Sequence, residues 1–238
     1  MEKENIKIAF ISDLHYSLAD NYTNPERCGQ QALAILDRAV SILNHDIRPD
    51  LVLVGGDVIN IPDGEDAEEL TAALAATLGK LLMPCTVIRG NHDMEQERFV
   101  KSFPFRRVTD VSFVRIVAFD DRETPGYNAE RSEDDIRFME NVETSGRLVF
   151  SFQHTPLTPP GSCIYSCDNA GKMLSLMRKN GWRGALSGHY HAGIELMEED
   201  GLQFFVQSAL CEKPFAMSIL TVGRNGIEKV EKIQLPVE

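Results

Sequence analysis

The sequence predicts an α/β fold, and three observations support this prediction. Short apolar segments rich in β-branched residues alternate with segments whose apolar positions recur at helical spacing. The run at 51–54 is entirely aliphatic, as is typical of a parallel strand buried on both faces. Polar residues follow directly after several of these strands, at the edge where open α/β sheets keep their ligands.

The first half of the chain alternates strictly between the two kinds of element. A strand is expected at 6–11, and a polar loop at 16–24 follows it. The helix from Pro25 to about Asn44 carries apolar residues at helical spacing, and Pro25 suits a helix start. A strand at 51–54, a helix at 65–82 and a strand at 85–88 complete a strand–helix–strand–helix–strand order, which predicts a parallel sheet.

The second half ends in strands alone. A short helix and loop are expected at 95–107, and a strongly charged helix at 130–143 has an acidic N-terminus. The remaining expected elements are strands at 113–119, 148–152, 185–187, 193–198, 202–208, 215–222 and 227–234, a turn-rich loop at 120–128 and a helix at 169–179. Because no linker, repeat or low-complexity segment interrupts the chain, residues 1–238 are predicted to form a single domain.

Composition bounds the function. The 238 residues are 43% hydrophobic, which is enough for a sizeable core, and the formal charge of −12 argues against strong binding of nucleic acid. The five cysteines are scattered, which favours reduced thiols. We find no signal-peptide pattern and no apolar run of membrane-spanning length, so we expect no membrane partner and a cytoplasmic location.

The polar strand exits carry the candidate functional residues. Asp13 and His15 lie two apart after the first strand, so both side chains point the same way in extended geometry. Behind the strand at 85–88, an amide oxygen, an imidazole and a carboxylate follow one another directly in Asn91, His92 and Asp93. The remaining candidates at strand exits are Asp57, His154, His189 and His191. Five of the six histidines lie at these exits, whereas structural histidines scatter over helices and surfaces.

These residue types suit two metal ions. Imidazole, carboxylate and carbonyl oxygen are ligands for manganese, iron and zinc. Seven candidate ligands are too many for one ion and suit two ions that share a carboxylate. Two ions about 3.5–4 Å apart are the usual machinery for in-line displacement at phosphorus. Two divalent ions outweigh the charges of Asp13 and Asp57, so an anionic substrate would meet a positive site within an acidic chain.

The ordered set of motifs resembles the signature of the calcineurin-like metallophosphoesterases. The matching stretches are Asp13-Leu14-His15, Gly56-Asp57, Gly90-Asn91-His92-Asp93, His154 and Gly188-His189-Tyr190-His191, which span about three quarters of the chain. The resemblance implies a four-layer αββα sandwich in which helices flank two central mixed sheets. It also implies a dinuclear site of manganese, iron or zinc, of which we favour manganese.

The resemblance implies a role for each matching residue. One ion would be held by Asp13, His15, Asp57 and His191, and the other by Asp57, Asn91, His154 and His189. A hydroxide between the ions would attack phosphorus. His92 would stabilise the transition state or protonate the leaving oxygen, and Asp93 would orient His92.

Departures from related subfamilies point to the small, bacterial-type cyclic-nucleotide phosphodiesterases. Asn60 stands where purple acid phosphatases carry a tyrosine, and the stretch after Asp57 differs from that of the protein phosphatases. A phosphodiester, nucleotide-type or otherwise small, is the expected substrate, because no motif stretch supplies the cationic clamp that a monoester dianion needs. Strand alternation does not decide whether Arg89 faces the metals, and Arg106, Arg107 and Arg122 are expected on the solvated surface.

Three alternatives stay open at this point. The first is a phosphomonoesterase of the same superfamily, the second a non-catalytic scaffold of this fold, and the third a mononuclear metallohydrolase acting on an amide or ester. The loop at 155–168 is expected to form a pocket wall, with Cys163 and Cys167 as reduced packing groups. The sequence does not name the physiological substrate, the two metals or the oligomeric state, a homodimer included.

Overall fold

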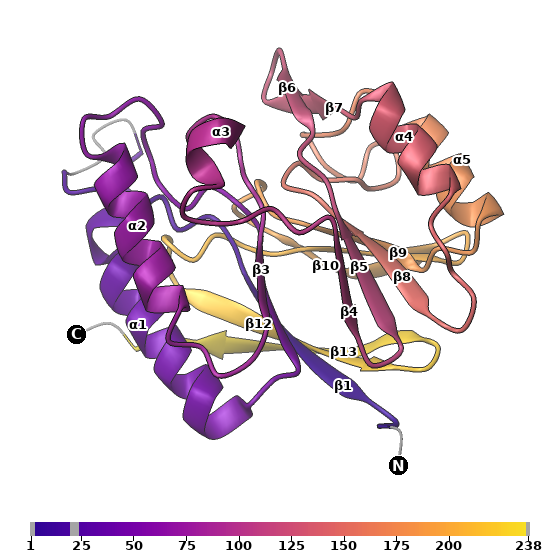
Figure 1. Ribbon diagram of the computed structural model, residues 1–238, viewed down its shortest axis with the longest axis horizontal. Coiled ribbons are helices and arrows are strands. Elements are labelled where there is room, and N and C mark those ends of the chain that lie inside the picture. Colours follow the sequence, from indigo (N-terminus) through magenta and orange to yellow (C-terminus); the bar gives the residue numbers. More distant parts are fainter. Residues whose placement is uncertain (1–2, 20–23, 237–238) are drawn as a thin grey trace.

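The computed structural model describes residues 3–19 and 24–236 and contains two large sheets that pack face to face between layers of helices (Figure 1). The first sheet has the order β13-β12-β1-β2-β3, and the second has the order β10-β11-β9-β8-β5-β4. This confirms the predicted α/β class with two mixed sheets flanked by helices.

The first sheet consists of β1 (Ile6–Ile11), β2 (Leu51–Val54), β3 (Cys85–Val87), β12 (Ala216–Gly223) and β13 (Gly226–Gln234). The second consists of β4 (Val108–Val111), β5 (Val114–Ala118), β8 (Leu148–Phe152), β9 (Gly184–Ser187), β10 (Ile194–Glu199) and β11 (Leu202–Val206). A separate hairpin pairs β6 (Arg122–Thr124) with β7 (Asn128–Glu130).

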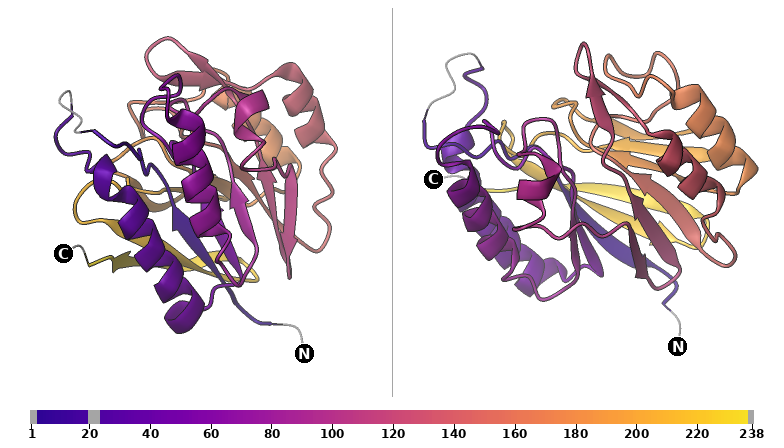
Figure 2. Two further views of the ribbon diagram at one scale, coloured as in Figure 1. Left: turned by 60° about the vertical axis from the view of Figure 1, so that its left-hand side comes forward. Right: turned by 45° about the horizontal axis from the view of Figure 1, so that its top comes forward.

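The helices are α1 (Ala32–Ile42), α2 (Ala67–Leu78), α3 (Gln96–Phe99), α4 (Glu133–Glu140) and α5 (Ala170–Lys179). A short 3₁₀ turn, Gly29–Gln31, precedes α1, and a π-helical turn, Leu43–Ile47, follows it. Helices α1 and α2 lie on the outer side of the first sheet, and α4 and α5 cover the second (Figures 1 and 2).

The strands that lead to the predicted site run in parallel within each sheet. In the first sheet β1 pairs with β2 and β2 with β3 in parallel, and in the second β5, β8 and β9 pair in parallel. The carboxyl ends of neighbouring parallel strands lie at one edge, so five strand exits can converge where the two sheets meet.

Strand alternation explains the continuous apolar runs of β1 and β2. Ala9 and Ile11 pack toward α1 and α2, whereas Ile8 and Phe10 pack toward the second sheet. Phe10 meets Phe152 of β8 edge to face, with ring centroids 5.6 Å apart, which joins the two sheets through their shared core. Both faces of these strands are therefore buried, as parallel strands between helical and sheet layers require.

Some element boundaries differ from the predictions for physical reasons. The first helix begins at Ala32 and not at Pro25, because the amide of Cys28 donates to the carbonyl of Cys211 and holds the preceding segment against another loop. Strand β4 and the β6–β7 hairpin were not predicted. Each carries few apolar residues, since β4 is a half-exposed edge strand and β6 is largely exposed.

The N-terminus of α4 and the loop at 16–24 were also predicted from the sequence. The acidic N-terminus of the fourth helix is correct, because Ser132 caps α4 by accepting from the amide of Asp135 at 3.1 Å. The predicted loop at 16–24 falls partly outside the described residues. Within the described ranges, no helix has the length and apolar character needed to cross a membrane.

Candidate metal centre

The predicted ligands come from both sheets and meet at one edge. Asp13 and His15 follow β1, Asp57 follows β2 and Asn91 follows β3. His154 follows β8, and His189 and His191 follow β9. Contacts between these side chains, given below, bring together all seven predicted ligands.

The backbone at several of these positions is unusual. The φ angles of Asp13, His15, Asp57 and His189 are 55°, 44°, 50° and 67°, in the left-handed region that residues with a Cβ seldom adopt. Such a conformation costs about 1–3 kcal/mol and persists only where its surroundings impose it. Here the amide of Asp13 donates to Gly56 O at 3.1 Å and that of His15 to Asp57 O at 2.9 Å, so the first two exits brace each other. Strain collected at predicted ligands supports a functional site.

Two glycines make the close approach possible. A Cβ at Gly90 would lie 2.2 Å from Asp57 Oδ1, and one at Gly188 would lie 2.0 Å from Ser12 Oγ. Both distances are shorter than any van der Waals contact. The glycines of these two motifs therefore allow the loops to touch the carboxylates and are not needed only as turn residues.

One group of ligands surrounds His15. The Nε2 atoms of His15 and His191 lie 3.1 Å apart, and Asp13 Oδ1 lies 3.5 Å from His191 Nε2. Asp13 is buried, and its Oδ1 has no hydrogen-bond partner among the described residues. A buried carboxylate oxygen without a partner is costly, which fits a position reserved for a cation.

The second group surrounds His154. Its Nε2 atom lies 3.2 Å from Asn91 Oδ1 and 3.1 Å from His189 Nδ1. Asp57 joins the two groups, because its Oδ2 lies 3.5 Å from His15 Nε2 and 3.3 Å from His154 Nε2. Its other oxygen accepts from the amide of His92 at 2.8 Å, which fixes the carboxylate plane.

Proton positions show what these groups can hold. His154 Nδ1 lies 2.6 Å from the carbonyl of Gly55, and His189 Nε2 lies 2.9 Å from the carbonyl of Tyr127. Carbonyl oxygens only accept, so each ring nitrogen donates there and the opposite nitrogen of a neutral ring carries a lone pair. The two lone pairs then face each other at 3.1 Å, an arrangement that needs a cation between them.

Burial and charge set the protonation of the ligands. Burial lowers the pKa of His189 to about 3 and that of His15 well below its usual range. Burial opposes the charge of Asp57, but His154 outweighs it and holds the pKa of Asp57 well below normal. Burial likewise disfavours protonated His154, yet Asp57 raises the pKa of His154 to about 10. In the metal-free site a proton therefore occupies part of the place that a cation would take.

The prediction that Asp93 orients His92 is wrong. His92 Nδ1 lies 2.8 Å from the carbonyl of Asn60, which orients the ring in place of Asp93. Asp93 instead accepts from the amides of Val58 at 2.8 Å, Ile59 at 3.1 Å and Gly90 at 2.8 Å. A turn closed by the Asp93 amide on Gly90 O directs this carboxylate inward, so it ties the loop after β2 to the loop after β3.

A cleft of about 510 Å³ opens beside the two groups of ligands. Its floor includes Asp57, Asn91, His92, His189 and His191. Its walls carry residues that sequence reasoning missed as site residues, namely Arg27, Tyr127, Tyr165, Tyr190 and Glu212.

All of these wall residues except Tyr190 lie outside the motifs. Glu212 Oε1 lies 2.5 Å from His191 Nδ1, so it orients a predicted ligand from the loop before β12. No periodicity or motif marks that loop in the sequence. Tyr165 shows that the loop between β8 and α5 does form a cleft wall, as expected, and Cys163 and Cys167 are free thiols.

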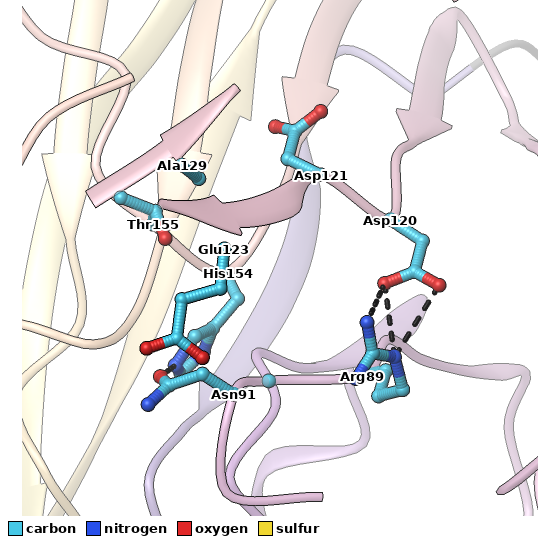
Figure 3. A pocket seen from close by; sticks show the side chains of 9 residues that line it. Arg89, Asn91, Asp120, Asp121, Glu123, Ala129, His154 and Thr155 are labelled. Carbon is cyan, nitrogen blue, oxygen red and sulfur yellow. Dashed lines mark hydrogen bonds and ion pairs between the residues drawn. The ribbon is translucent and has the colours of Figure 1, made fainter. Parts of the chain in front are cut away.

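The arginines considered as phosphate clamps point elsewhere. Figure 3 shows a smaller pocket beside Asn91 and His154, in which Arg89 turns toward Asp120. Arg89 Nη2 lies 3.0 Å from Asp120 Oδ1, so its charge is already paired. Arg107 pairs with Asp135 and Arg122 with Glu130, and neither lines the large cleft.

Comparison with known proteins agrees with this geometry. The family model described as calcineurin-like phosphoesterase matches residues 6–193. No curated protein matches the chain.

Several solved structures share the fold at low sequence identity. A dimetal phosphatase from Danio rerio has a TM-score of 0.75 and 17% identity, with coverage of 97% of this chain and 99% of that one. An anchor protein of the inner membrane complex of Plasmodium, GAP50, has a TM-score of 0.58 and 10% identity, with coverage of 99% and 90%. A novel archaeal phosphodiesterase has a TM-score of 0.50 and 14% identity, with coverage of 97% and 100%.

These likenesses show the fold, and the family model adds the motif order over most of the chain. The chain belongs to the calcineurin-like phosphoesterase family.

Proposed function

We propose that this protein is a dinuclear-metal-dependent phosphodiesterase that hydrolyses a nucleotide-type or other small phosphodiester. The single observation that carries the proposal is the position of Asp57 Oδ2, 3.5 Å from His15 Nε2 and 3.3 Å from His154 Nε2. One carboxylate oxygen shared by two ligand groups is what a pair of neighbouring ions requires.

The ligand set divides into two. Asp13, His15, Asp57 and His191 would hold one ion. The other ion would be held by Asp57, Asn91, His154 and His189. Bound there, two ions such as manganese would supply Lewis-acid activation of the phosphoryl group and of the attacking water.

His92 has the position of a proton donor. Its Nδ1 is committed to Asn60 O, and its ring lies 4.7 Å from the ring of His15, measured between centroids, at the cleft floor. In the protonated state, Nε2 carries the proton available to a leaving oxygen. A donor in this place matters most for a poor leaving group such as the alkoxide of a diester.

Charge favours a diester over a monoester. Two divalent ions against Asp13 and Asp57 leave a modest positive excess, which suits the single negative charge of a diester. The cleft of about 510 Å³ is also large enough for a small substrate with two substituents. Among the similar structures, one protein is called a phosphodiesterase and another a dimetal phosphatase, which supports phosphoester hydrolysis without choosing between them.

Phosphomonoester hydrolysis is the second candidate, and the observation that favours it is an arginine, Arg27, on the cleft wall. A non-catalytic scaffold is disfavoured because no predicted ligand and no proton donor is missing from the site. We also propose that residues 1–238 form one domain and that the protein acts in the cytoplasm.

The test compares two substrates with the same leaving group. Manganese-loaded protein is assayed on bis-p-nitrophenyl phosphate and on p-nitrophenyl phosphate. The proposal predicts the higher kcat/KM for the diester. A monoester preference of tenfold or more would assign the protein as a phosphatase. If neither substrate is hydrolysed, the non-catalytic scaffold becomes the favoured alternative.

A further inference from the structure

Arg27 is an arginine of the cleft wall that has no carboxylate partner among the described residues. It precedes the 3₁₀ turn before α1 and lines the cleft together with His92 and His191. Its Nε atom is buried and makes no hydrogen bond within the described ranges. Within the part of the chain that the structure describes, its side chain makes one long hydrogen bond, from Nη1 to Asn60 Oδ1 at 3.4 Å.

This state contrasts with that of other arginines near the site. Arg89 is paired with Asp120 at 3.0 Å, and the buried Arg131 is paired with Asp121 at 2.8 Å. Glu212 lines the same cleft, but its carboxylate is engaged with His191, which lowers the pKa of Glu212 more than the charge of Arg27 does. In a chain with a formal charge of −12, a half-buried guanidinium left without a carboxylate offers its donors to something else.

The charge of Arg27 acts on the metal side of the cleft. Arg27 lines the same cleft as two predicted ligands of the metal site, Asp57 and His191. Asn60 links Arg27 to the proton donor, since its side chain accepts from Arg27 and its carbonyl accepts from His92 Nδ1. Arg27 and His92 therefore both contact Asn60, and they lie close together at the part of the cleft where the leaving group would lie.

We propose that Arg27 is a specificity-determining residue that binds a second anionic oxygen of the phosphoester substrate. The substrate class is then a phosphodiester with a second negative charge on a neighbouring phosphate, whereas two charges on the reacting phosphorus would make it the phosphomonoester of the second candidate function. A planar guanidinium binds such oxygens through two parallel N–H donors, which a lysine cannot reproduce. This inference rests on the proposed phosphoesterase function and adds the charge that its substrate carries.

The experiment compares Arg27→Gln and Arg27→Lys with the wild type, and Arg106→Gln, an exposed arginine outside the cleft, is the matched control. All four proteins are loaded with manganese. The substrates are bis-p-nitrophenyl phosphate with one charge, p-nitrophenyl phosphate with two charges on one phosphorus, and P1,P2-diadenosine diphosphate with one charge on each of two. Arg27→Gln should lower kcat/KM for at least one doubly charged substrate by about tenfold more than for the singly charged diester.

A binding readout accompanies the kinetics. Inorganic phosphate should raise the melting temperature of the wild type and Arg106→Gln more than that of Arg27→Gln, whereas dimethyl phosphate should not distinguish the three. Arg27→Lys should recover part of the rise in melting temperature that phosphate causes, because lysine keeps the positive charge but lacks the two parallel N–H donors of a guanidinium. Millimolar guanidinium should also restore part of the activity of an Arg27→Ala variant on the affected substrate.

The outcomes separate the two proposals. A loss confined to p-nitrophenyl phosphate places the second charge on the reacting phosphorus, and a loss confined to the diphosphate places it on the neighbour. An equal loss of kcat/KM on all three substrates, with no difference in phosphate binding, would overturn the inference. Arg27 would then serve only to position Asn60 through their hydrogen bond. If the wild type hydrolyses none of the substrates, the proposed function fails, and phosphate binding alone then decides whether Arg27 binds an anion.

Discussion

A few proton positions determine what the strand exits can bind. His154 and His189 each donate from one ring nitrogen to a carbonyl oxygen, so when both rings are neutral their other nitrogens face each other as acceptors at 3.1 Å. His191 Nδ1 lies 2.5 Å from Glu212 Oε1, and its Nε2 lies 3.1 Å from His15 Nε2. Both facing pairs lie beside Asp57, so two places that favour a cation lie on either side of one carboxylate oxygen.

His92 separates chemistry from metal binding. His92→Ala should keep both ions, because each proposed ion has four other ligands although the His92 ring lies close to His15 and Asp57. It should lower kcat about 10²–10⁴-fold, the range for a positioned proton donor. Elemental analysis and steady-state kinetics on the same preparation measure both. His45→Ala, a change at an exposed histidine beyond α1, is the control and should retain wild-type values. Near wild-type turnover of His92→Ala would show that its assigned role is wrong.

His154 makes metal binding dependent on pH. Its pKa of about 10 in the metal-free site means that the proton on His154 stabilises the metal-free fold fully below about 6.5, and this contribution is lost as pH rises through about 10. A bound ion requires the neutral ring and must displace that proton. Manganese affinity should therefore rise by about tenfold per pH unit between pH 6 and pH 8.

The measurement is the melting temperature of manganese-loaded and chelator-treated protein across that range. The difference between the two should grow with pH. A constant difference would show that no ligand proton is displaced, contrary to the proton placed on His154.

The loops that follow the strands hold the predicted ligands through close contacts that only glycine allows. Gly90→Ala would place a Cβ 2.2 Å from Asp57 Oδ1 and 2.5 Å from Asp57 N, so the loop after β3 must move away from the loop after β2. We expect loss of bound metal and a lower melting temperature. Gly171→Ala in α5 is the control, because its Cβ meets nothing within 4 Å, and it should leave metal content unchanged and stabilise the helix by about 0.5–1 kcal/mol. Full metal content in Gly90→Ala would contradict this packing argument.

The same contrast between elements explains what the sequence could and could not predict. Apolar runs such as β1 and β2 are buried on both faces, so their almost entirely apolar composition predicts their burial. The β6–β7 hairpin is short and polar, and its Tyr127 reaches the cleft through tertiary placement that no local pattern encodes.

The site shows the same division. The predicted ligands could be picked out of the sequence because they directly follow recognisable strands. Arg27 and Glu212 were missed because each lies in an irregular segment that a distant contact holds in place. One example is the bond from Cys28 N to Cys211 O, which brings these two segments together. Asp93 was assigned the wrong partner, because sequence adjacency to His92 gave no information about the turn that directs its carboxylate inward.

At the scale of the whole molecule, the site joins the two sheets. One sheet supplies Asp13, His15, Asp57 and Asn91, and the other supplies His154, His189 and His191. The shared core between the sheets, with Phe10 against Phe152, fixes how the two sets face each other. Bound ions would thus cross-link the two sheets, and metal removal should lower the melting temperature of the protein as a whole.

The central claim is that two ions share Asp57, and metal stoichiometry tests it most directly. Elemental analysis of fully active, manganese-loaded protein should give about two ions per chain. Asp57→Ala should lose both metal and activity, because each ligand group depends on that carboxylate, while Asp63→Ala at an exposed position should retain about two ions. One ion per chain in fully active protein would contradict the dinuclear account and favour a mononuclear hydrolase.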